Sequence, residues 1–173
     1  IYLFEPTPKL CNDIRKWIGS YSNVHLIESA VDTDEISKLF YVAGHYDWGC
    51  SSLHEFSDNL DTTWPERPDL KVTDVIKVPC IRLDAFIEQN KIETINYLHI
   101  DTQGNDLNVL KSLGRYVDIV LSGQIEVPHN DIVKLYKTQH GLDETREWLD
   151  QNGFKITDIH SQQNEYNWHF DKK

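Results

Sequence analysis

The sequence predicts a single α/β domain with a mostly parallel sheet. Two observations carry this prediction. Apolar runs of strand length alternate with helical patterns along most of the chain, and the 173 residues amount to one domain. Apolar residues make up 39% of the sequence, which is enough for a sizeable core and typical of a globular chain.

A strand and a helix are expected first. Residues 1–4 form a buried strand, which the prolines of residues 5–8 interrupt. Thr7 or Pro8 then starts a helix that runs to about Ile18, because proline is favoured in a first helical turn. The apolar face of this helix is expected to consist of Leu10, Ile14, Trp17 and Ile18.

The next part of the chain holds extended segments around a long polar one. Residues 24–31 predict a second strand, residues 36–42 a short edge strand, and residues 72–83 a further extended segment. Residues 43–69 show no clear period, and an irregular stretch of this length is often a lid or a binding loop. Its aromatic residues are Tyr46, Trp48, Phe56 and Trp64.

Two helices and a strongly apolar strand are expected in the middle. Asp84 caps a short helix over residues 85–90. Residues 95–100 form the strand, and a turn then leads into a helix over residues 105–113. The inward side of that helix is expected to consist of Leu107, Val109, Leu110 and Leu113.

The remaining elements close the domain. Residues 117–125 predict an apolar strand, and a short helical stretch follows Pro128. A stronger helix covers residues 142–152 and stops at Gly153. A closing antiparallel pair is expected from residues 154–159 and 166–170.

Candidate site residues follow from this arrangement. Ligands of parallel sheets lie at the carboxyl ends of the strands. That rule selects a small set of positions: Glu5, Ser29, Ala30, residues 101–104 and residues 124–126.

Glu5 and Asp101 each have two interpretations. Glu5 can accept hydrogen bonds from the two hydroxyls of a ribose, or it can be a carboxylate that favours the start of a helix. Asp101 can orient a substrate hydroxyl, accept its proton or bind a cation, or it can belong to the start of the next helix. Gln103 cannot act as a base, so its role would be hydrogen bonding.

Two further positions involve histidine. Glu126 ends an apolar strand beside His129, and the two could form an acid/base pair, although a histidine after a strand is more often solvated. His99 lies within a strand and is expected to be a core or half-buried residue.

The polar segment over residues 43–69 offers other candidates. The spacing of His45, Asp47 and His54 does not support a metal site, and none is expected. Trp48 and Trp64 either cover a ligand or pin the segment to the core. No glycine-rich phosphate loop or nucleophile elbow occurs in the sequence.

Charge and composition exclude several classes of function. Asp and Glu number 28 against 17 Lys and Arg, a net charge of −11, which disfavours nucleic acid and anionic membrane surfaces as partners. No apolar stretch approaches the ~18 residues of a membrane span. Cys11, Cys50 and Cys80 are odd in number and lack metal-type spacing, so we expect free thiols and a cytoplasmic location.

Several segments together resemble the FkbM-type methyltransferases, across nearly the whole chain. The most specific part is the Asp-Thr-Gln-Gly turn followed by Val-Leu-Lys. The matching segments are Phe4-Glu5-Pro6-Thr7-Pro8, Ser29-Ala30-Val31, Leu83-Asp84-Ala85-Phe86, residues 98–111, Gln124-Ile125-Glu126, Leu135-Tyr136, Gly153-Phe154 and Asn164-Glu165-Tyr166-Asn167. These enzymes use S-adenosylmethionine and mostly methylate hydroxyl oxygens of sugars and natural products.

The resemblance implies a Rossmann-like class I methyltransferase sheet and a role for each matching residue. Glu5 would hold the cofactor ribose, and Ser29 and Ala30 would lie by the adenine. Asp101 would face the methyl-transfer site with Gln103 close by, and Glu126 would line the acceptor side. Many members carry Glu at position 103 and Glu at position 106, so the role of Asp106 is open.

One part of the family's fold is not found in this sequence. The family's first strand and glycine-rich turn, which hold the methionine part of the cofactor, would precede Ile1. The sequence contains no Met and starts within an apolar strand, so we expect residues 1–173 to be one N-terminally incomplete domain, a processed mature chain being the alternative. An upstream segment of ~30 residues would complete it. Its strand would lie between those of residues 1–4 and 95–100.

The resulting functional prediction is an S-adenosylmethionine-dependent O-methyltransferase acting on a saccharide or small-molecule hydroxyl. One alternative is a degenerate methyltransferase-like module that binds a partner without catalysis. Another is a nucleotide-sugar-using glycosyltransferase in which Asp101 holds a metal.

Overall fold

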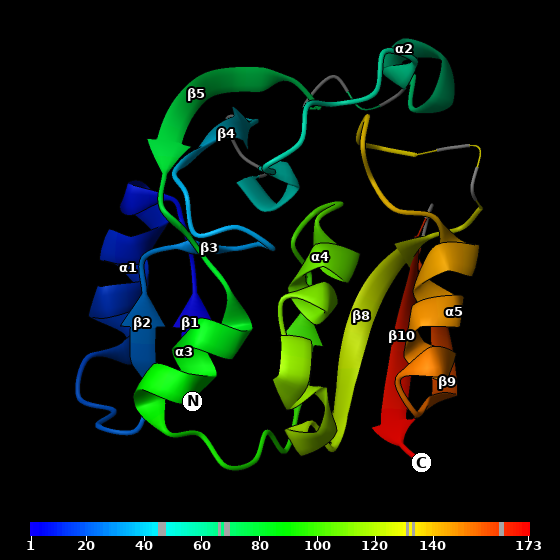
Figure 1. Cartoon of the computed structure of the whole chain (residues 1–173). Helices are drawn as coiled ribbons and strands as arrows, with labels where there is room; N and C mark the ends of the chain where they lie inside the picture. Colours follow the sequence, from blue (N-terminus) through cyan, green and yellow to red (C-terminus); the bar gives the residue numbers. More distant parts are fainter. Residues whose placement is uncertain (45–47, 66, 68–69, 131, 133, 163–164) are drawn as a thin grey trace.

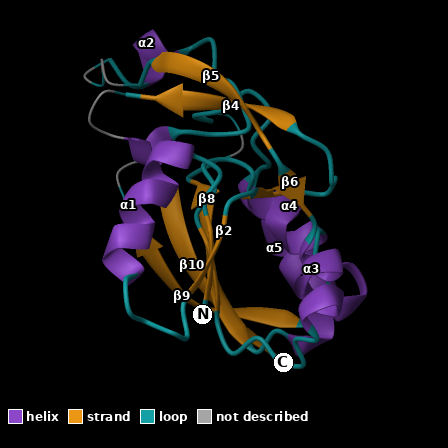
Figure 2. Cartoon of the chain, turned by 90° about the vertical axis from the view of Figure 1, so that its left-hand side faces the viewer, coloured by secondary structure: helices purple, strands orange, loops and turns teal. Residues whose placement is uncertain are grey.

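The computed structural model describes residues 1–44, 48–65, 67, 70–130, 132, 134–162 and 165–173. Its main strands form a middle layer, with helix α1 on one side and helices α3, α4 and α5 on the other (Figure 2). The chain is therefore a mixed α/β protein, as the sequence predicts. Among the described residues, no helix is long and apolar enough to cross a membrane.

The first unit is a β-α-β arrangement. Strands β1 (Tyr2–Phe4) and β2 (His25–Ile27) pair in parallel, and helix α1 (Pro8–Ile18) connects them. Pro8 starts α1, and Gly19 ends it with a φ of 39°. The expected apolar face is wrong at one position, because Trp17 is 73% exposed and Cys11 is buried instead.

The expected strand over residues 24–31 is divided between two sheets. After β2 the chain turns at Ser29, whose N–H donates to the carbonyl of Ile27. Strand β3 (Ala30–Val31) then pairs in parallel with β6 (Cys80–Ile81), far along the chain. This pairing brings Ser29 and Ala30 to the end of β1.

Strands β4 (Lys38–Ala43) and β5 (Val72–Val78) form an antiparallel arm at one end of the molecule (Figure 1). The segment between them contains a 3-10 turn, η1 (Trp48–Cys50), and a short helix, α2 (Leu60–Thr63). Backbone bonds between Tyr41 and Ser52 hold this segment against β4.

Helix α3 (Leu83–Asn90) starts two residues before the expected helix. Asp84 does not cap it, because Arg82 occupies the N-cap position and Asp84 lies in the first turn. There the Asp84 carboxylate pairs with the Arg82 guanidinium and accepts the Ala85 N–H at 2.8 Å.

The middle of the chain builds the central strands. Strand β7 (Leu98–Ile100) leads through a turn into α4 (Asp106–Lys111), whose inward residues are buried as predicted. The expected strand over 117–125 starts later, because residues Gly114–Ile119 form the 3-10 helix η2. Strand β8 (Ser122–Pro128) follows and runs beyond Glu126.

The C-terminal part completes the largest sheet. Helix α5 (Leu142–Gln151) is followed by β9 (Phe154–Ser161) and β10 (Glu165–Lys172), which pair antiparallel as predicted. The strand order is β7-β8-β10-β9. The short helix expected after Pro128 is not present among the described residues of that stretch, and residues 131 and 133 lie outside them.

The described strands do not form one continuous sheet. β1 pairs only with β2, and β7 pairs only with β8, so each leaves one edge that no described strand covers. Parallel and antiparallel pairings are equally represented, which corrects the expected mostly parallel sheet. The antiparallel pairings are those of β4 with β5, β8 with β10 and β9 with β10.

Candidate functional site

The turn after β7 is held by a buried carboxylate. Asp106 is 5% exposed and accepts hydrogen bonds from the Thr102 N–H at 2.7 Å and the Gly104 N–H at 3.0 Å. Burial raises the pKa of Asp106 to about 7, and the nearby Asp101 carboxylate adds to that shift. Asp106 therefore fixes the shape of the turn that presents Asp101 and Gln103.

Gln103 is the centre of the polar contacts at this turn. Its backbone is left-handed, with a φ of 56°. Its Nε2 donates to Asp101 Oδ1 at 2.6 Å and to Glu126 Oε2 at 3.1 Å. The same side chain accepts a hydrogen bond from the Tyr136 hydroxyl at 2.8 Å.

Glu126 and Glu165 form a pair of neighbouring carboxyl groups. Glu126 lies on β8 and is 6% exposed, and it is hydrogen-bonded to the half-buried Glu165 at the start of β10. Burial raises the pKa of both carboxyls, and the negative charge of Asp101 raises them further. The raised pKa values favour the protonated form of this pair, which can donate as well as accept.

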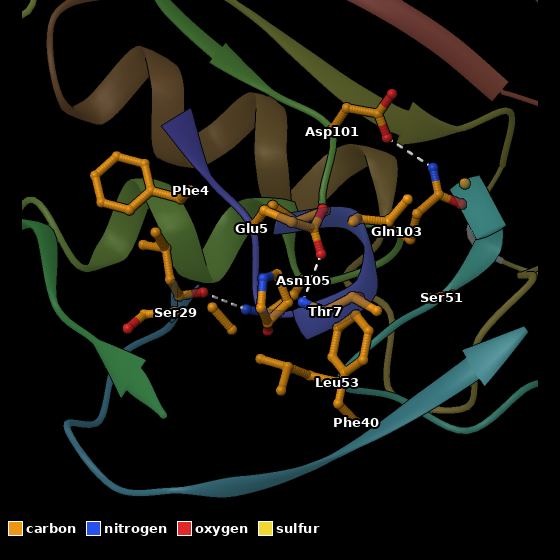
Figure 3. Close-up of a pocket in the computed structure, with 16 residues that line it drawn as sticks. Phe4, Glu5, Thr7, Ser29, Phe40, Ser51, Leu53, Asp101, Gln103 and Asn105 are labelled. Carbon is orange, nitrogen blue, oxygen red and sulfur yellow. Dashed lines mark hydrogen bonds between the residues drawn. The ribbon is translucent and has the colours of Figure 1, made fainter. Parts of the chain in front are cut away.

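A first cavity of about 260 Å³ lies at the carboxyl ends of β1 and β7. Figure 3 shows its lining, with Glu5 pointing toward Thr7 and Asp101 turned toward the Gln103 amide. The sequence-predicted residues that the structure brings together here are Glu5, Ser29, Ala30, Asp101 and Gln103. The apolar part of the lining includes Phe4, Leu10, Val31, Phe40 and Leu53.

Glu5 has one oxygen engaged and one available. Its Oε1 accepts the Thr7 N–H at 2.6 Å, which is a helix-start contact, and no described donor reaches Oε2. Both interpretations of Glu5 are thus compatible with the geometry. Thr7, which also lines the cavity, has a buried hydroxyl with no partner among the described residues.

A second cavity of about 430 Å³ adjoins the first. The two share Gly49, Asp101 and Gln103 in their linings, so Asp101 and Gln103 stand at the boundary between them. Around the second cavity lie Cys50, Trp64, Arg67, Leu70, Glu126, Leu135, Gln162 and Glu165. Trp64 both lines this cavity and packs with Leu70 and Tyr136, so its two proposed roles coincide.

None of the described histidines lines either of the two cavities. His129 packs against the Tyr166 ring, at 4.2 Å between centroids, and makes no described hydrogen bond with Glu126, so the structure gives no support to the candidate acid/base pair. His99 is exposed rather than half-buried. His54 Nε2 donates to Asn105 Oδ1 at 3.1 Å, and burial lowers the pKa of its ring.

The remaining predictions concern a metal site and the cysteines. His45, Tyr46 and Asp47 lie outside the described residues, and the described residues contain no group of three or more side chains that could hold a metal. None of the three cysteines forms a disulfide, in agreement with the prediction of thiols. Cys11 and Cys80 are buried, which raises the pKa of both, whereas Cys50 is half-buried and lines the second cavity.

Sequence reasoning missed two site residues, Tyr136 and Glu165, and left the role of the turn-fixing Asp106 open. Glu165 lies close to Glu126 because β10 pairs antiparallel with β8, and no local sequence pattern predicts the register of that pairing. Tyr136 follows β8 in an irregular segment. The available signal was that both lie in segments that match the family pattern.

Comparison with known proteins gives one match. A family model described as "Methyltransferase FkbM domain" matches residues 1–156. No curated protein and no solved structure matches the chain. The matched range includes all the residues given above as lining the two cavities except Gln162 and Glu165.

Proposed function

Because the chain belongs to the methyltransferase FkbM family, we propose that it transfers a methyl group from S-adenosylmethionine to a hydroxyl oxygen of a sugar or another small natural product. The observation that carries this proposal is the pair of adjoining cavities with Asp101 and Gln103 at their boundary. A transfer between two bound molecules requires two sites that meet at the reacting atoms.

The first cavity fits the cofactor by its donor set. Glu5 offers an available carboxylate oxygen to the ribose hydroxyls, and the apolar lining suits an adenine ring. The unpartnered Thr7 hydroxyl is a further polar group that a bound molecule can satisfy. When bound, S-adenosylmethionine supplies a methyl group on a positively charged sulfur.

The chain's own residues would position the acceptor and take its proton. Asp101 is exposed at the boundary, where its carboxylate can orient an acceptor hydroxyl and remove the proton. Glu126, whose raised pKa favours the protonated form, and the Gln103 amide would bind other oxygens of the acceptor or keep Asp101 in place. Trp64 offers an aromatic face, a surface on which sugar rings pack.

We further propose that a segment of the same protein upstream of Ile1 completes the cofactor site. The support is that β1 and β7 each have an edge that no described strand covers, while the first cavity lies at their carboxyl ends. Exposed edges of apolar strands are unfavourable inside a sheet.

Calorimetry of the full-length protein, with the segment upstream of Ile1, tests the cofactor assignment with S-adenosylhomocysteine as ligand. We expect micromolar binding, and Glu5→Gln should weaken it at least about tenfold, because a hydrogen bond to a charged group contributes ~1.5–3 kcal/mol. Glu28→Gln is the matched control, since Glu28 is exposed and pairs with Arg15 outside the cavity.

Two other outcomes would redirect the proposal. A folded protein that binds no S-adenosylhomocysteine would indicate a non-catalytic binding module. Activity that depends on a divalent cation and a nucleotide sugar would indicate the glycosyltransferase alternative.

A further inference from the structure

Tyr136 is a buried residue whose hydroxyl reaches the site. It is 1% exposed, and its hydroxyl lies 2.8 Å from Gln103 Oε1 and 2.9 Å from the Cys50 carbonyl oxygen. Both neighbours are acceptors, so they share the one hydrogen that the hydroxyl can donate. Its ring stacks on Phe56, at 5.4 Å between centroids, which fixes the direction of the hydroxyl.

The NH₂ end and the oxygen end of the Gln103 carboxamide have different neighbours. One end meets the Asp101 carboxylate and the Glu126 carboxyl group, and a carboxylate such as Asp101 favours an NH₂ group there. The other end meets the Tyr136 hydroxyl, where a carbonyl oxygen can accept its hydrogen. A rotated amide would place its oxygen against the Asp101 carboxylate, so the orientation with the NH₂ group toward Asp101 is favoured.

We propose that Tyr136 is a positioning residue of the methyl-transfer site, whose hydroxyl holds the Gln103 carboxamide so that both N–H groups face Asp101 and Glu126. This role rests on the proposed function, because it matters for activity only if Asp101 and Gln103 stand between cofactor and acceptor. The Gln103 backbone is fixed separately, since its carbonyl accepts from Ser52 Oγ at 2.6 Å. The hydroxyl of Tyr136 therefore controls the side chain rather than the turn.

The first measurement needs no substrate. In ¹H–¹⁵N spectra of the labelled protein, the side-chain amide of Gln103 is identified by its loss in Gln103→Leu. Tyr136→Phe keeps the ring and its stacking but removes the hydroxyl, and we expect the exchange of these amide protons with solvent to rise about tenfold, the equivalent of one hydrogen bond. Tyr41→Phe is the control, because its hydroxyl contacts Glu55 on the surface.

The second measurement links the contact to function. We expect Tyr136→Phe to weaken S-adenosylmethionine binding several-fold by calorimetry, because a displaced Asp101 carboxylate no longer faces the sulfonium charge. The effect on S-adenosylhomocysteine, which lacks the sulfonium charge, should be smaller. If Tyr136 acts through Gln103, the double variant with Gln103→Leu binds no more weakly than Gln103→Leu alone.

The outcomes separate the two proposals. Unchanged amide exchange in a folded Tyr136→Phe protein, or additive losses in the double variant, would overturn the role of Tyr136. If the wild-type protein binds neither form of the cofactor, the proposed function fails, and the amide exchange still decides whether Tyr136 holds Gln103.

Discussion

At the scale of single residues, Gly104 is required by two separate constraints. Its φ of 92° is a conformation that residues with a side chain rarely adopt. A Cβ at this position would also lie 2.7 Å from Cδ2 of Tyr136, so a side chain would push the positioning residue out of place. The turn therefore depends on the absence of a side chain as much as on the groups around it.

The backbone conformation of Gly104 and its close contact with Tyr136 have energetic costs that can be measured separately. Gly153 has a similar φ of 75°, but a Cβ there would meet only Lys172, at 3.8 Å. We expect Gly153→Ala to lower the free energy of unfolding by ~1–2 kcal/mol, the cost of the left-handed conformation. Gly104→Ala should cost a further ~1–3 kcal/mol from crowding. Equal losses in urea unfolding would mean that the Tyr136 ring can move away freely.

The buried carboxylates predict how stability depends on pH. The pKa of Glu126 is raised in the folded protein, and that of Asp106 is raised to about 7, so both bind protons that the unfolded chain has already released. The free energy of unfolding should therefore fall as pH rises from about 5 toward 9, by less than ~1.4 kcal/mol per pH unit for each proton.

Glu126→Gln tests the source of this slope, because it keeps the shape of the side chain and removes its titration. We expect a flatter pH profile than that of the wild type in urea unfolding at several pH values. Glu88→Gln is a surface control that should leave the slope unchanged, since Glu88 is exposed and pairs with Arg115. Stability of the wild type that rises over this pH range would contradict the burial argument.

At the scale of elements, α1 presents a face that the sequence does not predict. Periodicity places Trp17 with Leu10 and Ile14, yet Trp17 is 73% exposed. We expect Trp17→Ala to change the free energy of unfolding by less than ~0.5 kcal/mol, whereas Leu110→Ala in α4, at 0% exposure, should cost ~2–5 kcal/mol. A large loss from Trp17→Ala would mean that something covers this face in solution.

Elements with local boundary signals were predicted well. Pro8 and Gly19 limit α1, and Gly153 limits α5, because proline and glycine act on their own backbone. Elements defined by distant partners were not. The division of residues 24–31 into β2 and β3 depends on β6, some fifty positions later, and no local pattern carries that information.

The site shows the same division between local and distant signals. Glu5, Ser29, Ala30, Asp101 and Gln103 were chosen because each ends a strand, and the fold brings such positions together. Glu165 starts a strand instead, and it reaches Glu126 only because β10 runs opposite to β8. Positions of that kind require the strand register, which the sequence does not reveal.

At the scale of the whole molecule, the uncovered edges of β1 and β7 predict incomplete stability for this stretch of chain alone. If an upstream strand of the same protein fits between them, backbone N–H groups on these edges should exchange with solvent quickly in residues 1–173 and slowly when the upstream segment is present. Hydrogen exchange followed by mass spectrometry measures this.

A protein of residues 1–173 that melts cooperatively as a soluble monomer, with both edges already protected, would contradict this expectation. β8 and β10 are internal references for that experiment, because each has a strand on both sides in the described sheet. Their exchange should be slow whether or not the upstream segment is present.

The three thiols differ in accessibility, which allows one of them to be labelled selectively. Cys11 and Cys80 are enclosed in the interior, while Cys50 borders the cavity assigned to the acceptor. A fluorescent maleimide should therefore label Cys50 first, without any engineering of the chain. The dye would then sit at the rim of the acceptor cavity, where candidate sugars and natural products could be screened by the change in its emission.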